Sequence, residues 1–398
     1  MSSNLSSPTS STTTSPVIVG HRGFKSKYEE NTLFGFKKCF ETGAKVIETD
    51  LWLSKDNVIV ISHDQSTKRI FVDAQGQETN YKIPETDYNP ILKSLRTKER
   101  NEPLLTFKDV LNWFISYIET QPDSNEYKLQ LDIKRFNQPK ILKFVIEDLL
   151  SVNDSLSFWF HRIQFGLWDL NFLKYLNQNE YFQKVFEGCK VNDFGYSQFD
   201  IFHISVNWRD SIHYINYNFY LDENHNERIK IKLTGISLIY LSTWSIGFIT
   251  KFIPLLRIQN LKLYSWTINN KIQFNYLNEV GRLSNLIEYG IITDYPDVMS
   301  RIKTIEEELN IEMGKEMLVR SESKDYYNED GLLSINLSLK QKLLYFIYKY
   351  FNYFAGQKRV LDDETKFDAK VDENEIRYIH INPFFMWVFQ TCQKYGLL

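Results

Sequence analysis

Several charged residues of this 398-residue chain stand directly after short apolar runs. His21 and Arg22 lie between two glycines and follow the apolar residues 17–19. Glu48 and Asp50 stand two residues apart near the end of the next apolar run. Side chains two apart on a β-strand point to the same face, so these two carboxylates share one volume. Inward carboxylates repel each other unless a cation or proton lies between them, and Mg²⁺ or Ca²⁺ prefers such oxygen ligands.

Two further pairs of polar residues follow the same arrangement. His63 and Asp64 close a short hairpin, and Asp132 and Lys134 share a face at the end of a later apolar run. Asp132 is a candidate third metal ligand, and Lys134 is a candidate partner for an anionic group. Two histidines near a metal and an anion site indicate acid–base chemistry on a phosphate ester, with Arg22 neutralising phosphoryl charge. Each pair taken alone also fits a solvated strand end or a surface turn.

The elements that must position these residues follow from the apolar periodicity. Short apolar or β-branched runs bounded by polar residues or glycine predict strands, and helical patterns lie between them. The predicted strands are Val17–Gly20, Lys45–Leu51, Lys128–Ile133, Arg162–Leu167, Phe199–Val206, Lys232–Ile239, Lys262–Thr267 and Tyr289–Thr293. Such alternation predicts an α/β fold of the (β/α)8 TIM-barrel type, in which every strand end named above faces the active site. A doubly wound open sheet is the competing fold, but no GxGxxG pattern follows the first strand.

Other segments lie between or beside these strands. We expect helices over 31–42, 106–118, 139–150 and 244–259, a hairpin strand over 58–62, a surface excursion with little structure of its own over 64–103, and loop insertions over 178–198 and 218–231. Thr106 and Asp109 resemble an N-terminal capping pair.

Composition excludes several classes of protein. The 29 Phe, 24 Tyr and 8 Trp exclude a wholly disordered chain, and 16 Gly with 10 Pro exclude a collagen-like one. Because 47 basic residues are offset by 50 acidic ones without a basic block, we expect no nucleic-acid partner. Cys39, Cys189 and Cys392 are too far apart for a zinc motif or a disulfide framework, which indicates a reducing compartment. Residues 1–16, nearly all Ser, Thr, Pro and Asn, predict a disordered leader without a secretory signal.

The motifs taken together resemble the glycerophosphodiester phosphodiesterase family over about residues 17–300. The resemblance is carried, in this order, by His21-Arg22-Gly23, Glu29-Glu30-Asn31-Thr32, Glu48-Thr49-Asp50 and His63-Asp64. At the third-strand position the family more often has Glu, so Asp132 departs from its pattern. One branch, the fungal phosphatidylglycerol-specific phospholipases C, is similar at Gly166-Leu167-Trp168, Gly235-Ile236-Ser237 and Trp266-Thr267-Ile268-Asn269.

The resemblance implies cleavage of phosphatidylglycerol to diacylglycerol and glycerol 3-phosphate, with the glycerol hydroxyl as internal nucleophile. It implies an acid–base pair (His21, His63), divalent metal ligands for Mg²⁺ or Ca²⁺ (Glu48, Asp50, Asp132) and phosphate contacts (Arg22, Lys134). Trp266 lines the glycerol pocket or fills the barrel core. Two alternatives stay open: a hydrolase of soluble glycerophosphodiesters, and a catalytically inactive membrane scaffold.

Residues 303–398 form a tail with two aromatic clusters, 343–355 and 383–389. Thirteen helical residues span about 20 Å, whereas a bilayer core needs about 30 Å. We therefore expect the first cluster to lie in a membrane interface, on an intracellular organelle membrane, with the protein peripheral or tail-anchored. The alternative is that both clusters pack on the outside of the barrel 17–302. The oligomeric state is not readable from the sequence.

Overall fold

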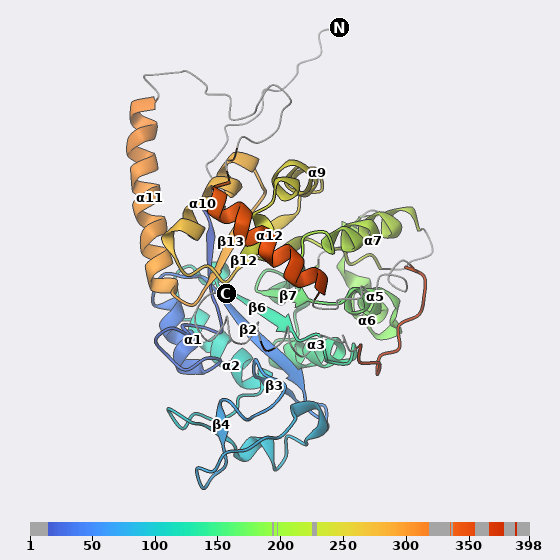
Figure 1. Ribbon diagram of the computed structural model, residues 1–398. Coiled ribbons are helices and arrows are strands. Elements are labelled where there is room, and N and C mark those ends of the chain that lie inside the picture. The colour runs from blue at the N-terminus through green and yellow to red at the C-terminus, as the bar shows by residue number, and fades with distance from the viewer. Residues whose placement is uncertain are drawn as a thin grey trace.

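A closed barrel of eight parallel strands forms the centre of the computed structural model (Figure 1). The structure describes residues 15–192, 195–196, 198–224, 229–317, 335, 337–354, 366–377 and 387. The barrel strands are β1 (Val17–Gly20), β2 (Val46–Leu53), β6 (Lys128–Ile133), β7 (Ile163–Leu167), β10 (Asp200–Ser205), β11 (Gly235–Ile239), β12 (Lys262–Trp266) and β13 (Tyr289–Thr293). They pair in this order, and β13 pairs back onto β1. The predicted TIM barrel and each predicted strand are confirmed, with small shifts at the strand ends.

The barrel interior is filled by alternate residues of the strands. Val19, Val46, Phe202, Tyr264 and Ile292 form one buried cluster, and each comes from a different strand. Side chains of a strand alternate between its two faces, so the next inward positions beyond this cluster lie at the carboxyl ends of the strands. Those positions carry the polar residues singled out in the sequence. This apolar cluster thus forms the floor of a polar site at the carboxyl ends of the strands.

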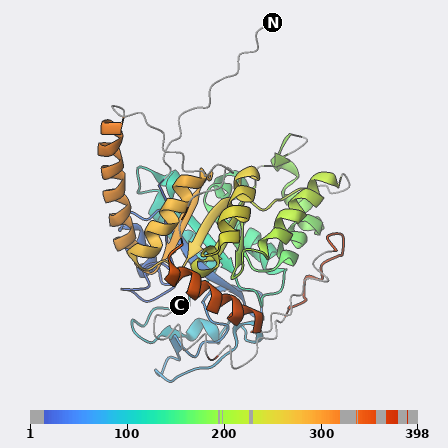
Figure 2. The ribbon, with the colours of Figure 1, turned by 45° about the horizontal axis from the view of Figure 1, so that its top comes forward.

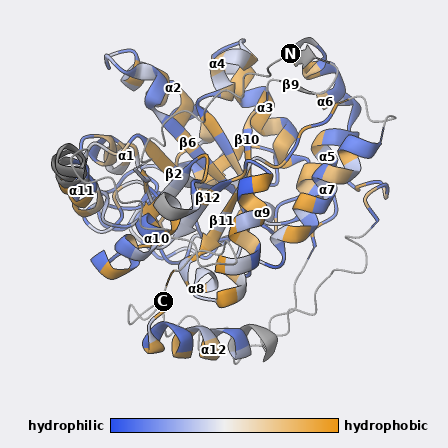
Figure 3. Cartoon of the chain, turned by 90° about the horizontal axis from the view of Figure 1, so that it is seen from above, coloured by the Kyte–Doolittle hydropathy of each residue, from blue (hydrophilic) through white to orange (hydrophobic). Residues whose placement is uncertain are grey.

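Helices surround the strands, as Figure 3 shows from above. They are α1 (Leu33–Phe40), α2 (Phe107–Ile118), α3 (Ile141–Val152), α4 (Leu156–Phe160), α5 (Leu170–Gln178), α6 (Glu180–Val185), α7 (Ser211–Glu223), α8 (Tyr240–Thr243), α9 (Ile253–Ile258), α10 (Lys271–Ser284) and α11 (Pro296–Met317). Thr106 and Asp109 form the expected capping box of α2. The helix expected over 244–259 is present over 246–258 and contains a π-helical turn, Phe248–Phe252, directly before α9. Pro254, which has no backbone N–H, stands in the first turn of α9.

The expectation of an unstructured excursion over 64–103 is wrong. This insertion follows the hairpin strand β3 (Ile59–Ile61) and contains the antiparallel pair β4 (Phe71–Val72) and β5 (Arg96–Thr97). It packs around a second buried cluster, to which β2 and β3 also contribute: Trp52, Val60, Phe71, Ile83, Leu92, Leu95 and Leu104. These residues come from separate short segments of the chain, so no single strand or helix period reveals the cluster, and they meet only when the chain folds.

The two segments expected to be loop insertions are also partly regular. Residues 178–198 contain α6 and a short hairpin of β8 (Lys190–Asn192) and β9 (Gly195–Tyr196). The segment 218–231 begins inside α7, which continues to Glu223. The domain boundary expected at 302 falls within the continuous helix α11. Polar composition alone was a poor guide here, because exposed short helices are as polar as loops.

Two described parts of the tail contact the barrel. Helix α12 (Leu339–Phe354) crosses in front of the barrel in Figure 2 and lies next to α8. Residues 366–377, which we call the strap, run along α5 and α7. Residues 1–14 and all of the cluster 383–389 except Trp387 lie outside the described residues. Among the helices that the structure describes, none has the length and apolar character needed to cross a membrane.

Candidate active site

The residues selected from the sequence meet at the carboxyl ends of neighbouring strands. Asp50 of β2 lies directly opposite Asp132 of β6 in their parallel pairing, and Glu48 is the next inward residue of β2. His21 follows β1, and its backbone N–H donates to the Thr293 carbonyl at the end of β13 at 2.9 Å. The register in which neighbouring strands pair brings these groups together, and no single sequence motif determines that register.

Three buried carboxylates form the centre of the site. Glu48, Asp50 and Asp132 each offer an oxygen, and these oxygens lie within 4.8 Å of one another. Burial, together with the charges of Asp50 and Asp132, raises the pKa of Glu48 well above its usual range. The pKa of Asp50 is held well below its usual range, despite its burial, by Lys134 and Arg22. The raised pKa of Glu48 beside the lowered pKa of Asp50 shows that burying three negative charges together is unfavourable without a further positive charge.

Two cations partly offset this charge. Lys134 Nζ lies 2.6 Å from Asp50 Oδ1 and 2.6 Å from Asp132 Oδ2. Arg22 Nε lies 3.4 Å from Asp50 Oδ2, and the Arg22 backbone N–H donates to Glu48 Oε2 at 2.9 Å. Even so, three buried carboxylates stand against two cations. Three clustered carboxylates are a donor set that suits Mg²⁺ or Ca²⁺, so the cluster can hold a divalent cation.

Each of the two histidines is held by a carboxylate. His21 Nδ1 lies 2.6 Å from Asp294 Oδ1, and His63 Nδ1 lies 2.7 Å from Asp64 Oδ1. A carboxylate accepts from Nδ1–H, which leaves the Nε2 lone pair of each neutral ring available for a proton. Burial and the Arg22 guanidinium lower the pKa of His21 to about 4, and burial and the cations of the site lower that of His63 to about 4. Both imidazoles are therefore neutral at pH 7.

A chain of alternating charges joins the carboxylate cluster to His63. Arg22 Nη1 donates to Glu30 at 3.2 Å, and Arg69 donates to Glu30 at 2.6 Å and to Asp64 at 2.5 Å. Arg69 comes from the insertion, so the insertion fixes the carboxylate that orients His63. Despite burial, Arg22 and Arg69 lower the pKa of Glu30 to about 2. The sequence marked Glu30 as part of a motif but gave no role to Arg69, since its partners lie 39 and 5 residues away.

Asn31 ties the loop after β1 to the cluster. Its amide donates to Asp50 Oδ2 at 2.8 Å and its carbonyl accepts from the Thr49 hydroxyl at 2.8 Å. Asn31 adopts a left-handed backbone with φ of 57°, a conformation that Asn tolerates better than most residues. The Asn31 backbone N–H donates to the Arg22 carbonyl at 3.1 Å, and Arg22 itself has φ of 52°. These hydrogen bonds hold the guanidinium-bearing turn against the carboxylates.

Two tryptophans line the other side of the site. Trp168, which follows β7, donates its indole N–H to Asp132 Oδ1 at 2.7 Å. Its ring meets Trp266, at the end of β12, edge to face with a centroid distance of 5.9 Å. The buried Nε1 of Trp266 has no hydrogen-bond partner within the described chain. Trp266 is therefore placed at the barrel mouth with a donor that a substrate hydroxyl can use.

Asp294, which follows β13, is a residue of the site to which the sequence motifs gave no role. In the structure its second oxygen accepts from Asn269 Nδ2 at 2.9 Å, and Asn269 Oδ1 accepts from the Asp294 backbone N–H at 3.0 Å. The position after a barrel strand was the available signal, but the partner, His21, is 273 residues away.

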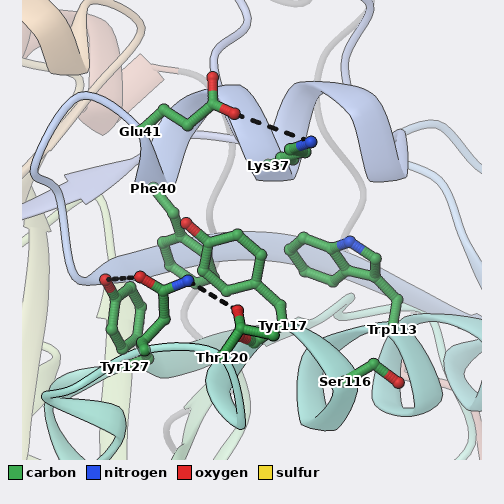
Figure 4. A pocket seen from close by; sticks show the side chains of 9 residues that line it. Lys37, Phe40, Glu41, Trp113, Ser116, Tyr117, Thr120 and Tyr127 are labelled. Atoms are coloured by element: carbon green, nitrogen blue, oxygen red, sulfur yellow. Dashed lines mark hydrogen bonds and ion pairs between the residues drawn. The ribbon is translucent and has the colours of Figure 1, made fainter.

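A separate aromatic hollow lies on the outside of the barrel (Figure 4). Its volume is about 620 Å³. It lies between α1 and α2 and is lined by Lys37, Phe40, Glu41, Trp113, Ser116, Tyr117, Thr120, Gln121 and Tyr127. The predicted catalytic residues are not among them. This hollow and the polar site are thus different places.

The fold and the site define a TIM-barrel protein with a buried carboxylate cluster that can hold a divalent cation. A profile of the glycerophosphoryl diester phosphodiesterase family matches residues 21–298, and the chain belongs to that family. YqiK of Bacillus subtilis, an uncharacterized protein, is 33% identical over 132 residues, which are 30% of this chain and 53% of YqiK. A glycerophosphodiester phosphodiesterase of Bacillus altitudinis is 42% identical over 52 residues, 13% of this chain and 21% of that protein. The chain thus spans about half or less of these relatives.

Solved structures show the same fold. A glycerophosphoryl diester phosphodiesterase from Silicibacter pomeroyi superimposes with a TM-score of 0.51 and 16% identity, covering 74% of this chain and 95% of the other. One from Galdieria sulphuraria gives 0.50 and 16%, covering 73% and 98%. At this level of identity the likeness establishes the barrel architecture alone.

Proposed function

We propose that this protein is a metal-dependent phosphodiester hydrolase that cleaves phosphatidylglycerol to diacylglycerol and glycerol 3-phosphate. One observation carries the proposed chemistry. Two neutral imidazoles, each oriented by a carboxylate, stand at the same barrel end as three buried carboxylates. This combination supplies proton transfer and charge stabilisation together, which the hydrolysis of a phosphodiester requires.

In the first step the glycerol hydroxyl next to the phosphate attacks phosphorus. One imidazole, of His21 or His63, takes the hydroxyl proton through Nε2, and the other gives a proton to the diacylglycerol oxygen. A new oxygen–phosphorus bond forms, the bond between phosphorus and the diacylglycerol oxygen breaks, and a cyclic phosphate results. The attack is intramolecular, so it gains from proximity. Water then opens the cycle as the imidazoles exchange roles, and glycerol 3-phosphate leaves.

The cations of the site act on the phosphate. Arg22 and Lys134 would contact its non-bridging oxygens, and Trp266 would donate its free indole N–H to the glycerol head group. A divalent cation held by Glu48, Asp50 and Asp132 supplies Lewis-acid stabilisation of the phosphoryl charge. An anionic phosphate beside the imidazoles favours their charged form and raises their pKa, because opposite charges attract. Substrate binding therefore favours the protonated form of the imidazole that gives its proton to the diacylglycerol oxygen.

Helix α12 supports a lipid rather than a soluble substrate. Tyr348 donates its hydroxyl to the Val206 carbonyl, and Arg209 donates to the Tyr345 hydroxyl at 3.4 Å. Val206 and Arg209 follow β10, so α12 lies at the rim of the same barrel end as the site. The opposite side of α12 carries exposed apolar residues: Leu339, Leu343, Phe346, Ile347 and Tyr350.

Cations accompany this apolar side. Lys340, Lys342 and Lys349 are exposed on α12, which suits a surface of anionic lipids. We therefore propose that the protein binds peripherally to an intracellular membrane, with α12 in the interface. The free thiols of Cys39 and Cys189 support a reducing compartment. Cys392 lies outside the described residues.

The test is incubation of the full chain with vesicles of defined phospholipids, with and without a chelator. Diacylglycerol release from phosphatidylglycerol vesicles, lost with the chelator, supports the proposal. Hydrolysis of glycerophosphocholine without action on any vesicle would replace it with the soluble-substrate alternative. His21→Ala should abolish either activity, and full activity in that variant would overturn the assigned chemistry. An enzyme inactive on all substrates would favour the scaffold.

A further inference from the structure

The strap, residues 366–377, is attached along its length to the barrel helices (Figure 1, at the right). Gln178 of α5 donates to the Ala369 carbonyl at 3.1 Å and accepts from the Val371 N–H at 3.1 Å. The Tyr175 hydroxyl donates to Glu373 at 2.8 Å. The Glu373 carbonyl in turn accepts from the backbone N–H of Lys140, which follows β6, at 3.1 Å. The strap thus leads to the barrel end that carries the site.

The last described residue of the strap, Arg377, reaches the turn between β7 and α5. With the Asn171 amide oxygen facing the guanidinium, that oxygen accepts from Arg377 Nε and Nη2, both at 2.7 Å. Arg377 Nη1 lies 4.0 Å from Asp169 Oδ1. Asp169 is buried and caps α5 by accepting from the Asn171 N–H at 2.9 Å. One guanidinium therefore holds both the cap residue and the first turn of α5.

This turn also carries a direct contact to the carboxylate cluster. Trp168 immediately precedes Asp169 and donates its indole N–H to Asp132 Oδ1 at 2.7 Å. A side chain that fixes residues 169 and 171 limits where the indole of residue 168 can lie. Hydrogen bonds that orient a metal ligand commonly contribute ten- to a hundredfold to metal affinity.

We propose that Arg377 is a positioning residue of the site: from the strap it holds the β7–α5 turn so that Trp168 orients Asp132. The proposal rests on the proposed role of Asp132 as a metal ligand. Arg377 lies outside residues 21–298, which match the family profile. The strap is thus a part of this chain's site that the barrel alone does not supply.

The test measures metal affinity of the full chain by calorimetry with Mn²⁺, Mg²⁺ and Ca²⁺, beside the thermal midpoint. Arg377→Ala should weaken binding of the metal that the wild type binds by about tenfold. Arg377→Lys should recover part of this, because an ammonium keeps the charge but lacks the planar fork that gives two N–H donors to one oxygen. Tyr175→Phe is the matched control, since it removes one strap hydrogen bond but none of the contacts that Arg377 makes.

Asn171→Ala gives an independent route to the same contact. It should weaken metal binding as Arg377→Ala does, and the double variant should lose little more than either single one, because both remove one interaction. If Arg377→Ala binds metal within twofold of Tyr175→Phe, or if the Arg377 and Asn171 losses simply add, the proposal is overturned. A wild type that binds none of the three metals would instead overturn the metal site of the proposed function.

Discussion

The carboxylate of Asp294 offers a sharp perturbation, because Asp294→Asn changes one atom. Asn269 is held in a single orientation: its carbonyl accepts from the Asp294 backbone N–H at 3.0 Å and from the Thr293 hydroxyl at 3.2 Å. Its amide N–H must then face residue 294, where Asp294 Oδ2 accepts it at 2.9 Å. The other oxygen, Oδ1, lies 2.6 Å from His21 Nδ1. Both carboxylate oxygens are therefore acceptors.

An asparagine at 294 can supply only one of these acceptors. If its oxygen faces Asn269, its NH₂ faces His21 Nδ1, and the ring must carry its proton on Nε2, where it cannot accept another. If its oxygen faces His21, two NH₂ groups oppose each other. A lost hydrogen bond to a charged group costs about 1.5–3 kcal/mol, which is about 10- to 150-fold in rate. We expect kcat to fall about 100-fold, within the range known for general acid–base catalysis.

The assay is the release of glycerol 3-phosphate under saturating substrate, with KM measured in parallel. Lys25→Ala is the matched control, because its ammonium lies 3.7 Å from the same Asp294 oxygen without orienting the ring, and its effect should stay within a few-fold. Since Asp294 acts through His21, adding Asp294→Asn to His21→Ala should lower the residual rate no further. A normal kcat in Asp294→Asn, or a further fall in the double variant, would refute this reasoning.

Three other outcomes follow from the structure. In metal-free protein, His21 has a pKa of about 4, against about 6.5 in the unfolded chain, so acid favours the unfolded state, which binds the proton more readily. Between pH 6.5 and 4 the free energy of unfolding of the wild type should fall by about 3 kcal/mol. His21→Asn should not show this fall, which urea titration measures. Arg69→Ala removes the guanidinium that bridges Glu30 and Asp64 and should lower kcat about tenfold with little change in thermal midpoint. Lys68→Ala on the same loop should change neither quantity. Equal kcat values in the two variants would contradict a role of Arg69 in orienting His63 through Asp64. Replacing Leu343 and Ile347 together by Asp should reduce flotation with phosphatidylglycerol vesicles at least tenfold while leaving hydrolysis of soluble glycerophosphocholine unchanged. Unaltered flotation would exclude α12 as the membrane contact.

Point substitutions on α12 are preferable to removing the tail. Deleting residues 335–398 would take away the strap as well, and with it the hydrogen bonds to α5 and the contact of Arg377 with the β7–α5 turn. Loss of activity after such a deletion would therefore have two causes. The two aspartate substitutions leave the strap in place and alter only exposed side chains.

The sequence by itself determined the barrel and the side-chain chemistry. Apolar runs alternating with helical patterns predicted all eight strands, because strand and helix periods are local properties of the chain. The charged residues just after those runs, His21, Glu48, Asp50 and Asp132, could be chosen because parallel strands of a closed barrel all present their carboxyl ends on one side. Both inferences need only local spacing and one rule of barrel geometry.

Only the tertiary structure decided which partners orient these groups. Asp294 reaches His21 across 273 residues because β13 closes onto β1. Arg69 reaches Glu30 because apolar residues of the insertion pack together with side chains of β2 and β3. The contact between Arg377 and the turn after β7 joins the tail to the barrel in a way that no period or motif encodes. Such contacts depend on strand register and loop packing, which are set by the fold as a whole, whereas strands and strand-end residues are set by their immediate neighbours.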